Sequence, residues 1–183
     1  MTDQLSNGFI SQDFKLEIPD GDDRIRRICR KCRFIDYINP KIVAGAVVTN
    51  RDKILLCKRA IDPRKGFWTL PAGFMEEGES VEEAAMREAL EEANAEIRID
   101  QVLAIYSVPR ISQVQVMFRA ELMSDISAGI ESEEVGLFEW KNIPWASLAF
   151  PSVVWALTHF AQTRNAPAFP PFTNPPGTEA LTR

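Results

Sequence analysis

The chain has 183 residues, of which 45% are hydrophobic and 26% are charged, as in an ordinary globular domain with a buried core. Its apolar runs are too short to cross a bilayer, and its first residues lack the basic and apolar regions of a secretory signal. The short apolar runs exclude a membrane protein. Three cysteines are too few for a disulfide framework, which excludes a secreted mini-protein, and we expect a cytoplasmic protein.

The net charge of −5 is concentrated in one segment, residues 76–92, which holds eight glutamates and one arginine. This segment carries a local charge of −7, whereas the rest of the chain carries +2. A negative balance argues against a protein that binds nucleic acid through bulk charge. The acidic segment is therefore the feature that a functional interpretation has to explain.

The first region, residues 1–40, is polar and contains a turn sequence at Pro19-Asp20-Gly21, which predicts a small β hairpin. It also contains Cys29 and Cys32, spaced as C-x-x-C. A structural zinc site takes four ligands, so this pair supplies half of one.

The second region, residues 41–164, alternates short apolar runs with turn residues. The predicted strands cover residues 42–49, 53–59, 97–108, 114–123 and 135–140. Apolar residues at helical spacing predict a helix over 152–164. This order favours an α/β (α+β) fold with a mixed sheet covered by helices. The last region, residues 165–183, holds five of the twelve prolines, and we expect a tail that is mostly extended or flexible.

The acidic segment itself is predicted to be a helix. Ser80 and Glu83 have the spacing of a capping box at its start. Asn94 stands where the helix should end, and asparagine is second only to glycine as a left-handed C-terminal cap. The boundaries of this helix are therefore fixed at both ends.

Three carboxylates, those of Glu88, Glu91 and Glu92, share one face of this helix because they lie three and four residues apart. Arg87 can pair with Glu91, but one arginine does not neutralise three glutamates. Clustered oxygen ligands are what Mg²⁺ or Mn²⁺ binds, usually together with substrate phosphates and water. A solvated acidic helix is the alternative, and it is the commoner fate of a glutamate-rich helix.

The residues around the carboxylates decide between these interpretations. They read Gly73, five residues, Glu79, seven residues, then Arg87-Glu88-Ala89-Leu90-Glu91-Glu92. This pattern resembles the Nudix box of the Nudix hydrolases, G-x5-E-x7-R-E-U-x-E-E-x-G-U, where U is aliphatic. Asn94 replaces the last glycine of the box, and because asparagine tolerates left-handed backbone we expect activity to survive.

The resemblance implies a Nudix α/β/α sandwich in which water, with the help of a divalent metal, cleaves the pyrophosphate of a nucleoside diphosphate linked to another group. The metal ligands implied by position are Glu88, Glu91 and Glu92. Glu79 and Arg87 would brace the loop and the helix, and Gly73 would let the backbone approach the site. The implied cofactor is Mg²⁺ or Mn²⁺.

Further segments resemble one Nudix branch, in which a short zinc-ribbon-like element precedes the catalytic domain. The matching segments are ICRKC, NPKIVAG, LLCKRAIDPRKGFWTLPAGFMEEGES, VPRISQV and LAFPS. Members of this branch hydrolyse FAD, to FMN and AMP, or ADP-ribose. Cleavage of NADH or of nucleoside triphosphates is an alternative enzymatic activity. A Nudix domain that senses a nucleotide such as ADP-ribose without cutting it is an alternative of a different functional class. The resemblance is also compatible with a homodimer.

Five further residues are candidates for the site. Phe67 and Trp68 precede the box, where an aromatic ring can stack on a base or a flavin, although a place in the core is equally compatible with the sequence. Arg59 and Arg110 lie at predicted strand ends and are candidate ligands for phosphate oxygens. Glu134, in a predicted loop, is a candidate general base or metal ligand, with a solvated loop charge as the alternative.

The cysteine pair does not complete a zinc site. The branch resembled here carries another C-x-x-C upstream, where this chain has Asn7 and Ile10, and neither is a good zinc ligand. Cys57 lies in an apolar run and is interpreted as a small buried hydrophobe, and His159 as a structural or surface residue. We therefore expect no bound zinc and no zinc-ribbon interaction with nucleic acid.

Overall fold

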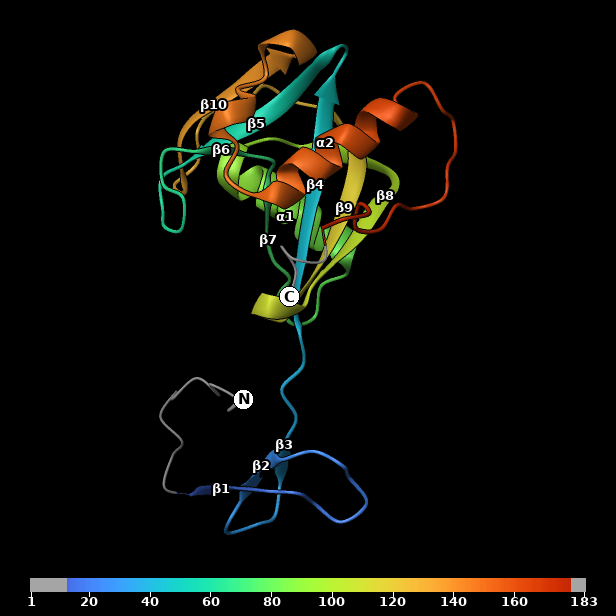
Figure 1. The fold of residues 1–183 in the computed structure, drawn as a ribbon. Coiled ribbons are helices and arrows are strands. Elements are labelled where there is room, and N and C mark those ends of the chain that lie inside the picture. The colour runs from blue at the N-terminus through green and yellow to red at the C-terminus, as the bar shows by residue number, and fades with distance from the viewer. Residues whose placement is uncertain (1–12, 179–183) are drawn as a thin grey trace. The chain divides into compact units, whose positions relative to one another are not determined.

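The computed structural model describes residues 13–178, so Asn7 and Ile10 lie outside the described residues. The chain divides between Asn39 and Pro40 into two units, and Figure 1 labels the helices and strands of both. No helix in the described part of the chain is long and apolar enough to span a membrane.

The first unit is a three-stranded antiparallel sheet. Its strands, in spatial order, are β1 (Phe14–Glu17), β2 (Arg26–Cys29) and β3 (Ile35–Asp36). The predicted small β element is confirmed: the turn sequence lies between β1 and β2, and Gly21 takes a φ of 83°, which only glycine adopts without strain.

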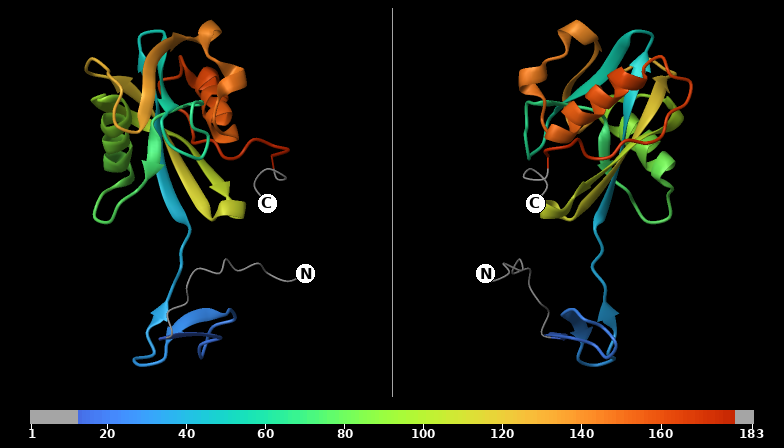
Figure 2. Two further views of the ribbon diagram at one scale, coloured as in Figure 1. Left: turned by 90° about the vertical axis from the view of Figure 1, so that its left-hand side faces the viewer. Right: turned by 45° about the vertical axis from the view of Figure 1, so that its right-hand side comes forward.

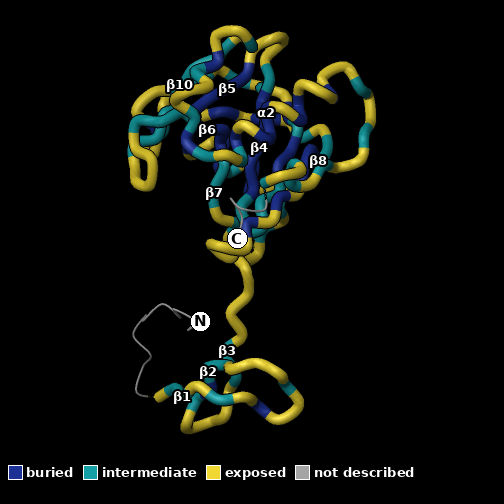
Figure 3. The backbone as a smooth tube through the Cα atoms, in the orientation of Figure 1, coloured by how far each residue is buried: buried dark blue, intermediate teal, exposed yellow. Residues whose placement is uncertain are grey.

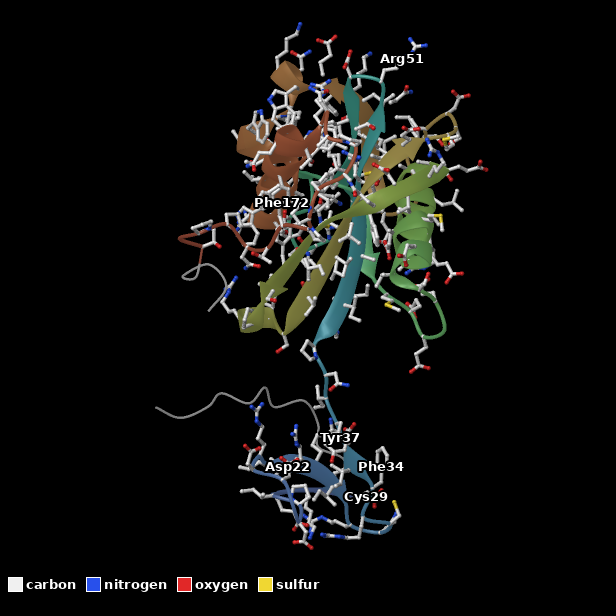
Figure 4. All side chains as sticks on the ribbon, turned by 90° about the vertical axis from the view of Figure 1, so that its right-hand side faces the viewer. Asp22, Cys29, Phe34, Tyr37, Arg51 and Phe172 are labelled. Atoms are coloured by element: carbon white, nitrogen blue, oxygen red, sulfur yellow. The ribbon has the colours of Figure 1, made fainter. Side chains whose placement is uncertain are left out.

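The core of this unit is thin. Ile28 of β2 is fully buried, whereas Phe34, Tyr37 and Ile38 each expose more than half of their surface. Figure 4 labels Cys29, Phe34 and Tyr37 in this unit. Cys29 is half-buried and Cys32 is exposed. A sheet of this size buries little apolar surface of its own.

The second unit is built on a seven-stranded mixed sheet. Its main path runs β10–β5–β4–β9–β8, with β6 paired to β5 and β7 paired to β4. The strands are β4 (Lys41–Asn50), β5 (Lys53–Arg59), β6 (Trp68–Thr69), β7 (Ala72–Phe74), β8 (Ile97–Val108), β9 (Gln113–Leu122) and β10 (Ser132–Glu139). The pairs are antiparallel except for β4 and β9, which run parallel.

The two helices, α1 (Val81–Ala93) and α2 (Pro151–Thr163), cover opposite faces of this sheet (Figure 2). Successive residues of β4 point alternately into two cores, Ala46 and Val48 toward α1 and Val47 toward α2. Burial is therefore concentrated along the central strands, as Figure 3 shows. The mixed sheet covered by helices that the sequence predicts is confirmed.

The two cores differ in the size of their side chains. The α1 side is lined by alanines of the helix, namely Ala84, Ala85, Ala89 and Ala93, which let the helix lie close to the sheet. The α2 side is filled by large residues that include Tyr106, Trp155, Leu157 and Phe160. Cys57 is buried in the α1 core, and His159 is buried at α2, where its Nδ1 lies 2.8 Å from the Tyr106 hydroxyl.

The described part of the segment after α2 contains no helix, and one of its residues pairs with the sheet. Over its described part, Phe172 pairs with β8 through two backbone hydrogen bonds of 2.9 Å, to Leu103 and Ile105. Its ring, labelled in Figure 4, stacks on His159 with 4.2 Å between the ring centroids. Proline removes backbone donors, but the aromatic side chains between the prolines supply apolar anchors. Residues 179–183 lie outside the described part.

Candidate active site

A cavity of about 610 Å³ lies between α1, the sheet and the start of α2. Six acidic residues line it, namely Asp62, Glu76, Glu88, Glu91, Glu92 and Glu131, together with Arg59, Arg87 and Arg110. Its apolar wall includes Val43, Phe74, Met117, Phe150 and Trp155. A lining that contains both charged and apolar residues suits a ligand that carries both phosphates and a planar ring.

A second concavity, of about 870 Å³, lies at the turn between β4 and β5 and shares no residue with the first. Its charged side chains pair with one another, as Arg164 does with Asp52 at 2.6 Å and Lys141 with Glu139 at 3.0 Å. This second concavity contains no residue of the acidic helix, whereas the cavity of 610 Å³ does. The cavity of 610 Å³ is therefore the candidate active site.

The helix that carries the carboxylates has the predicted ends. Ser80 Oγ accepts a hydrogen bond from the backbone N–H of Glu83 at 3.2 Å, and Glu83 Oε2 accepts one from the backbone N–H of Ser80 at 2.7 Å. Asn94 ends the helix in left-handed backbone, with φ 47° and ψ 34°. These caps fix which helical positions face the cavity.

Arg87 links the loop before α1 to the helix. Its Nε donates to Glu79 Oε2 at 3.0 Å and its Nη2 to Glu79 Oε1 at 2.8 Å. Nη2 also donates to the Phe74 carbonyl at 2.9 Å, and Nη1 to Glu88 at 2.8 Å and Glu91 at 3.1 Å. The paired guanidinium lowers the pKa of Glu79 to about 2. The hydrogen bonds of Arg87 therefore connect α1 to Glu79 and Phe74 in the segment before it.

Gly73 makes room for the first carboxylate. A Cβ atom at this position would lie 2.3 Å from the carboxylate atoms of Glu88, which no side chain tolerates. Glu88 is only 8% exposed, and this burial raises its pKa although Arg87 donates to it. A glycine in β7 is thus what allows a buried carboxylate against the sheet.

Glu92 is the most deeply buried carboxylate, at 4% exposure, and within the described residues its Oε2 has no hydrogen-bond partner. Burial, followed by the charge of Glu88, raises the pKa of Glu92 to about 8, whereas Arg59 and the Ala72 N–H act in the opposite direction. A buried carboxylate oxygen without a donor is costly unless a cation compensates it. These residues fit a hard divalent cation.

The cation would not be held by the protein alone. In the described part of the chain no three acidic, Cys or His side chains converge on one point, and Arg87 Nη1 donates to both Glu88 and Glu91. Glu91 is 56% exposed at its side chain. Mg²⁺ usually takes one or two carboxylates and completes its shell with substrate phosphates and water.

The two predicted arginines reach the same cavity from separate elements. Arg59 lies at the end of β5, where its Nε donates to the Pro63 carbonyl at 2.8 Å and its guanidinium lies 5.4 Å from the centre of the Phe150 ring. Arg110 lies in the short 3-10 helix η1 (Pro109–Ile111). Both guanidinium groups line the cavity that contains the carboxylates.

The structure places three predicted residues outside the cavity. Trp68 packs edge-on against Phe138, with 4.8 Å between ring centroids, and Phe67 lies under the guanidinium of Arg64. Glu134 lies within β10 instead of a loop, with its Oε2 at 3.7 Å from Lys58 Nζ. Its side chain is 60% exposed. In this geometry the two rings contact protein side chains, and the Glu134 carboxylate lies beside Lys58.

The sequence interpretation missed Glu131. This residue lies three positions before Glu134 in the same acidic run, and its side chain lines the cavity. Its negative charge contributes to the raised pKa of both Glu88 and Glu92. The acidic stretch of residues 131–134 indicated that a carboxylate from this segment could reach the site. Which of its glutamates faces the cavity depends on where β10 begins.

Comparison with known proteins agrees with this geometry. The NUDIX domain family matches residues 39–160, and the Nudix N-terminal family, a zinc-ribbon family, matches residues 11–38. The chain belongs to the Nudix family. It is a pyrophosphohydrolase of this family, and the N-terminal element and the catalytic domain occur in the order that the sequence resemblance implied.

This Nudix chain has both curated and solved relatives. An ADP-ribose pyrophosphatase from Methanocaldococcus jannaschii is 34% identical over 119 residues, which cover 62% of this chain and 69% of the relative. The NAD-capped RNA hydrolase NudC from Photorhabdus laumondii is 35% identical over 51% of this chain but only 36% of its own length. A crystal structure of a NUDIX hydrolase from Nitrosomonas europaea has 47% identity and a TM-score of 0.82, covering 88% of this chain and 93% of its own.

Proposed function

We propose that this protein hydrolyses the pyrophosphate bond of a nucleoside diphosphate linked to a second group, with ADP-ribose or FAD as substrate and Mg²⁺ or Mn²⁺ as cofactor. The observation that carries the proposal is the buried, unpartnered Oε2 of Glu92 beside Glu88, on the wall of a cavity that also contains Arg59 and Arg110. The similarity to an ADP-ribose pyrophosphatase supports this substrate class. With FAD the products are FMN and AMP.

In the proposed complex, glutamates bind the cation and arginines bind the phosphates. Glu88 and Glu92 would hold the cation from the protein side, with Glu91 at the exposed edge of the cluster. When bound, such a cation neutralises the diphosphate and acidifies a water molecule. Arg59 and Arg110 suit the remaining phosphate oxygens, because guanidinium groups bind phosphate in bidentate geometry.

Proton removal is assigned to Glu131. Asp62, Glu76 and Glu131 line the cavity from outside α1. Of these three, Glu131 is the one whose charge contributes to the raised pKa of both Glu88 and Glu92, so it suits the acceptance of a proton from the attacking water beside the helical cluster. Glu134, which the sequence suggested for this role, faces Lys58 instead. The apolar wall, with Phe74 and Trp155, is suited to the base or the flavin.

NADH is the second candidate substrate. The similarity to NAD-capped RNA hydrolases favours it, and its pyrophosphate joins two nucleosides as in FAD. The same cavity has both the cationic and the apolar surface that a dinucleotide requires.

The test is incubation of the full chain with ADP-ribose, FAD, NADH and ATP, with Mg²⁺ and with EDTA, and chromatography of the products. We expect release of AMP from ADP-ribose or FAD in Mg²⁺ and none in EDTA. Faster cleavage of NADH would shift the proposal to the second candidate. Cleavage of ATP alone, or AMP release that EDTA leaves unchanged, would contradict it.

A further inference from the structure

The loop between β9 and β10, residues 123–131, lies against the C-terminal end of α1. The backbone N–H of Ser127 donates to the Ala93 carbonyl at 3.0 Å, and the N–H of Gly129 donates to the Glu92 carbonyl at 3.1 Å. The last carbonyls of a helix have no partner within the helix. Here the loop supplies N–H donors for the carbonyls of Ala93 and Glu92, and Glu92 is a proposed cation ligand.

Asn94 adds a second connection between the same two segments. Its Nδ2 lies 3.2 Å from the Ser127 carbonyl oxygen, 3.0 Å from Ser127 Oγ and 3.3 Å from the Ala128 carbonyl oxygen. Glycine, which the Nudix box has at this position, adopts the same left-handed backbone but has no amide. These contacts therefore depend on the one position where this chain departs from the box.

Gly129 keeps the loop close to the helix. A Cβ atom at this position would lie 1.7 Å from the Glu91 carbonyl oxygen, so only glycine permits this approach. Beyond it, Ile130 is 97% exposed and has no packing that would orient the chain. The position of the following residue, Glu131, then depends on how the loop is held.

Glu131 is fixed on its other side by the sheet, since its carbonyl accepts from the Ala60 N–H at 2.8 Å. Only two residues, Gly129 and Ile130, separate it from Ala128, the last contact of the Asn94 amide. Its side chain lines the cavity that Glu88 and Glu92 also line. A displacement of the loop of about 1 Å would therefore change the distance between the proton acceptor and the cation ligands, and such displacements reduce turnover strongly.

We propose that Asn94 is a positioning residue: its side-chain amide holds residues 127–128 on the end of α1 and thereby sets Glu131 relative to Glu88 and Glu92. The catalytic part of this inference rests on the proposed function of Glu131. If Asn94 served only to end the helix, glycine would serve at least as well.

The variants Asn94→Gly and Asn94→Asp separate the two roles. Glycine retains the left-handed cap and removes the amide, whereas aspartate retains the shape but turns a donor into an acceptor that faces carbonyl oxygens. We expect kcat to fall about tenfold in both, with KM within about twofold and with no loss of thermal stability in Asn94→Gly. Wild-type kcat in Asn94→Gly would overturn the inference.

A double-mutant comparison shows whether Asn94 acts through Glu131. Glu131→Gln removes the proton acceptor, so adding Asn94→Gly to it should cause no further loss of kcat. Two losses that multiply would show that Asn94 affects turnover by another route, and would contradict the inference.

Amide hydrogen exchange of the full chain tests the loop without any substrate. We expect the amides of Ser127 and Gly129 to exchange faster in Asn94→Gly, and to be unchanged in the control Ile130→Ser, which alters an exposed side chain of the same loop. Unchanged exchange in Asn94→Gly would overturn the inference. A wild-type chain that cleaves none of the four nucleotides would instead contradict the proposed function.

Discussion

The burial of Glu92 opposes the charged form of its carboxylate, whereas cation binding requires that form. Its carboxylate is buried beside that of Glu88, which raises its pKa to about 8 and opposes the charged form. A divalent cation needs that charged form. A side chain in this setting costs stability in the metal-free protein, and such a cost is typical of residues that serve a site instead of the fold.

Glu92→Gln should therefore separate activity from stability. The amide has the same volume and no charge, so we expect an unchanged or slightly higher Tm without metal and a loss of at least about a hundredfold in kcat with Mg²⁺. Steady-state kinetics with ADP-ribose and thermal melts in EDTA measure the two effects.

Glu82→Gln is the matched control, because Glu82 is an exposed glutamate of the same helix. It removes the same charge from α1 away from the cavity, and we expect kcat within about twofold of wild type. Equal kinetics for Glu92→Gln and wild type would refute the assignment of Glu92 to the cation.

His159 gives the stability of the protein a pH dependence. Burial lowers its pKa, so between the unfolded value of about 6.5 and the lower folded value the unfolded chain binds a proton that the folded chain does not. Stability from this residue is complete above that window and decreases as the pH falls through it. Glu88 and Glu92, whose pKa values are raised, have the opposite sign.

The contribution of His159 is isolated by comparing Tm between pH 7.5 and pH 5 in wild type and His159→Gln. The carboxylates are common to both proteins, so we expect a smaller decrease of Tm toward pH 5 in the variant, even if its Tm is lower throughout because the bond to Tyr106 is lost. Parallel Tm curves would mean that His159 does not titrate differently on folding.

Among the elements, the segment after α2 acts as an additional strand beside β8. Phe172→Ala removes the ring stacked on His159, and we expect a loss of about 2 kcal/mol of unfolding free energy, less than the 3–5 kcal/mol of a fully buried phenylalanine because this residue is half-buried. Urea unfolding measures it. Thr173→Ala, at an exposed neighbour, is the control and should have no effect.

Long elements with a clear period could be predicted from the sequence, and short ones could not. The predicted boundaries of β4, β5, β8 and α1 are within one residue of the structure, because each has enough residues to show a pattern. β6 and β7 have two and three residues and exist through pairing with β5 and β4. No local pattern identifies strands that are defined only by their neighbours.

In the candidate site, too, some residues could be placed from the sequence and others could not. Glu79, Arg87, Glu88, Glu91 and Glu92 could be placed because a capped helix fixes their spacing. The choice between Glu131 and Glu134 could not be made, because it depends on where β10 begins and on a register shift between Ser132 and Glu134. A shift of one residue moves a side chain to the other face of a strand. The pairing of Phe172 with β8 could not be predicted for a related reason, since composition does not show what this residue contacts.

For the whole molecule, the ligand count of the N-terminal unit leads to a prediction about zinc. Cys29 and Cys32 are two thiols, and the remaining cysteine and the only histidine are buried in the other unit. Two thiols do not close a structural zinc site. We expect the purified chain to contain far less than one zinc per chain by metal analysis, and its Tm to be unaffected by EDTA in the absence of magnesium. One tightly held zinc per chain would contradict this.

The parallel pairing of β4 with β9 has a consequence for synthesis. Lys41 pairs with Gln113, so the centre of the sheet joins segments about seventy residues apart, and contacts over such separations form slowly. The cavity draws on residues from Val43 to Trp155. On the ribosome, catalytic competence therefore arrives only after the chain has emerged as far as Trp155, and until then the apolar strands lack their partners and are exposed to aggregation.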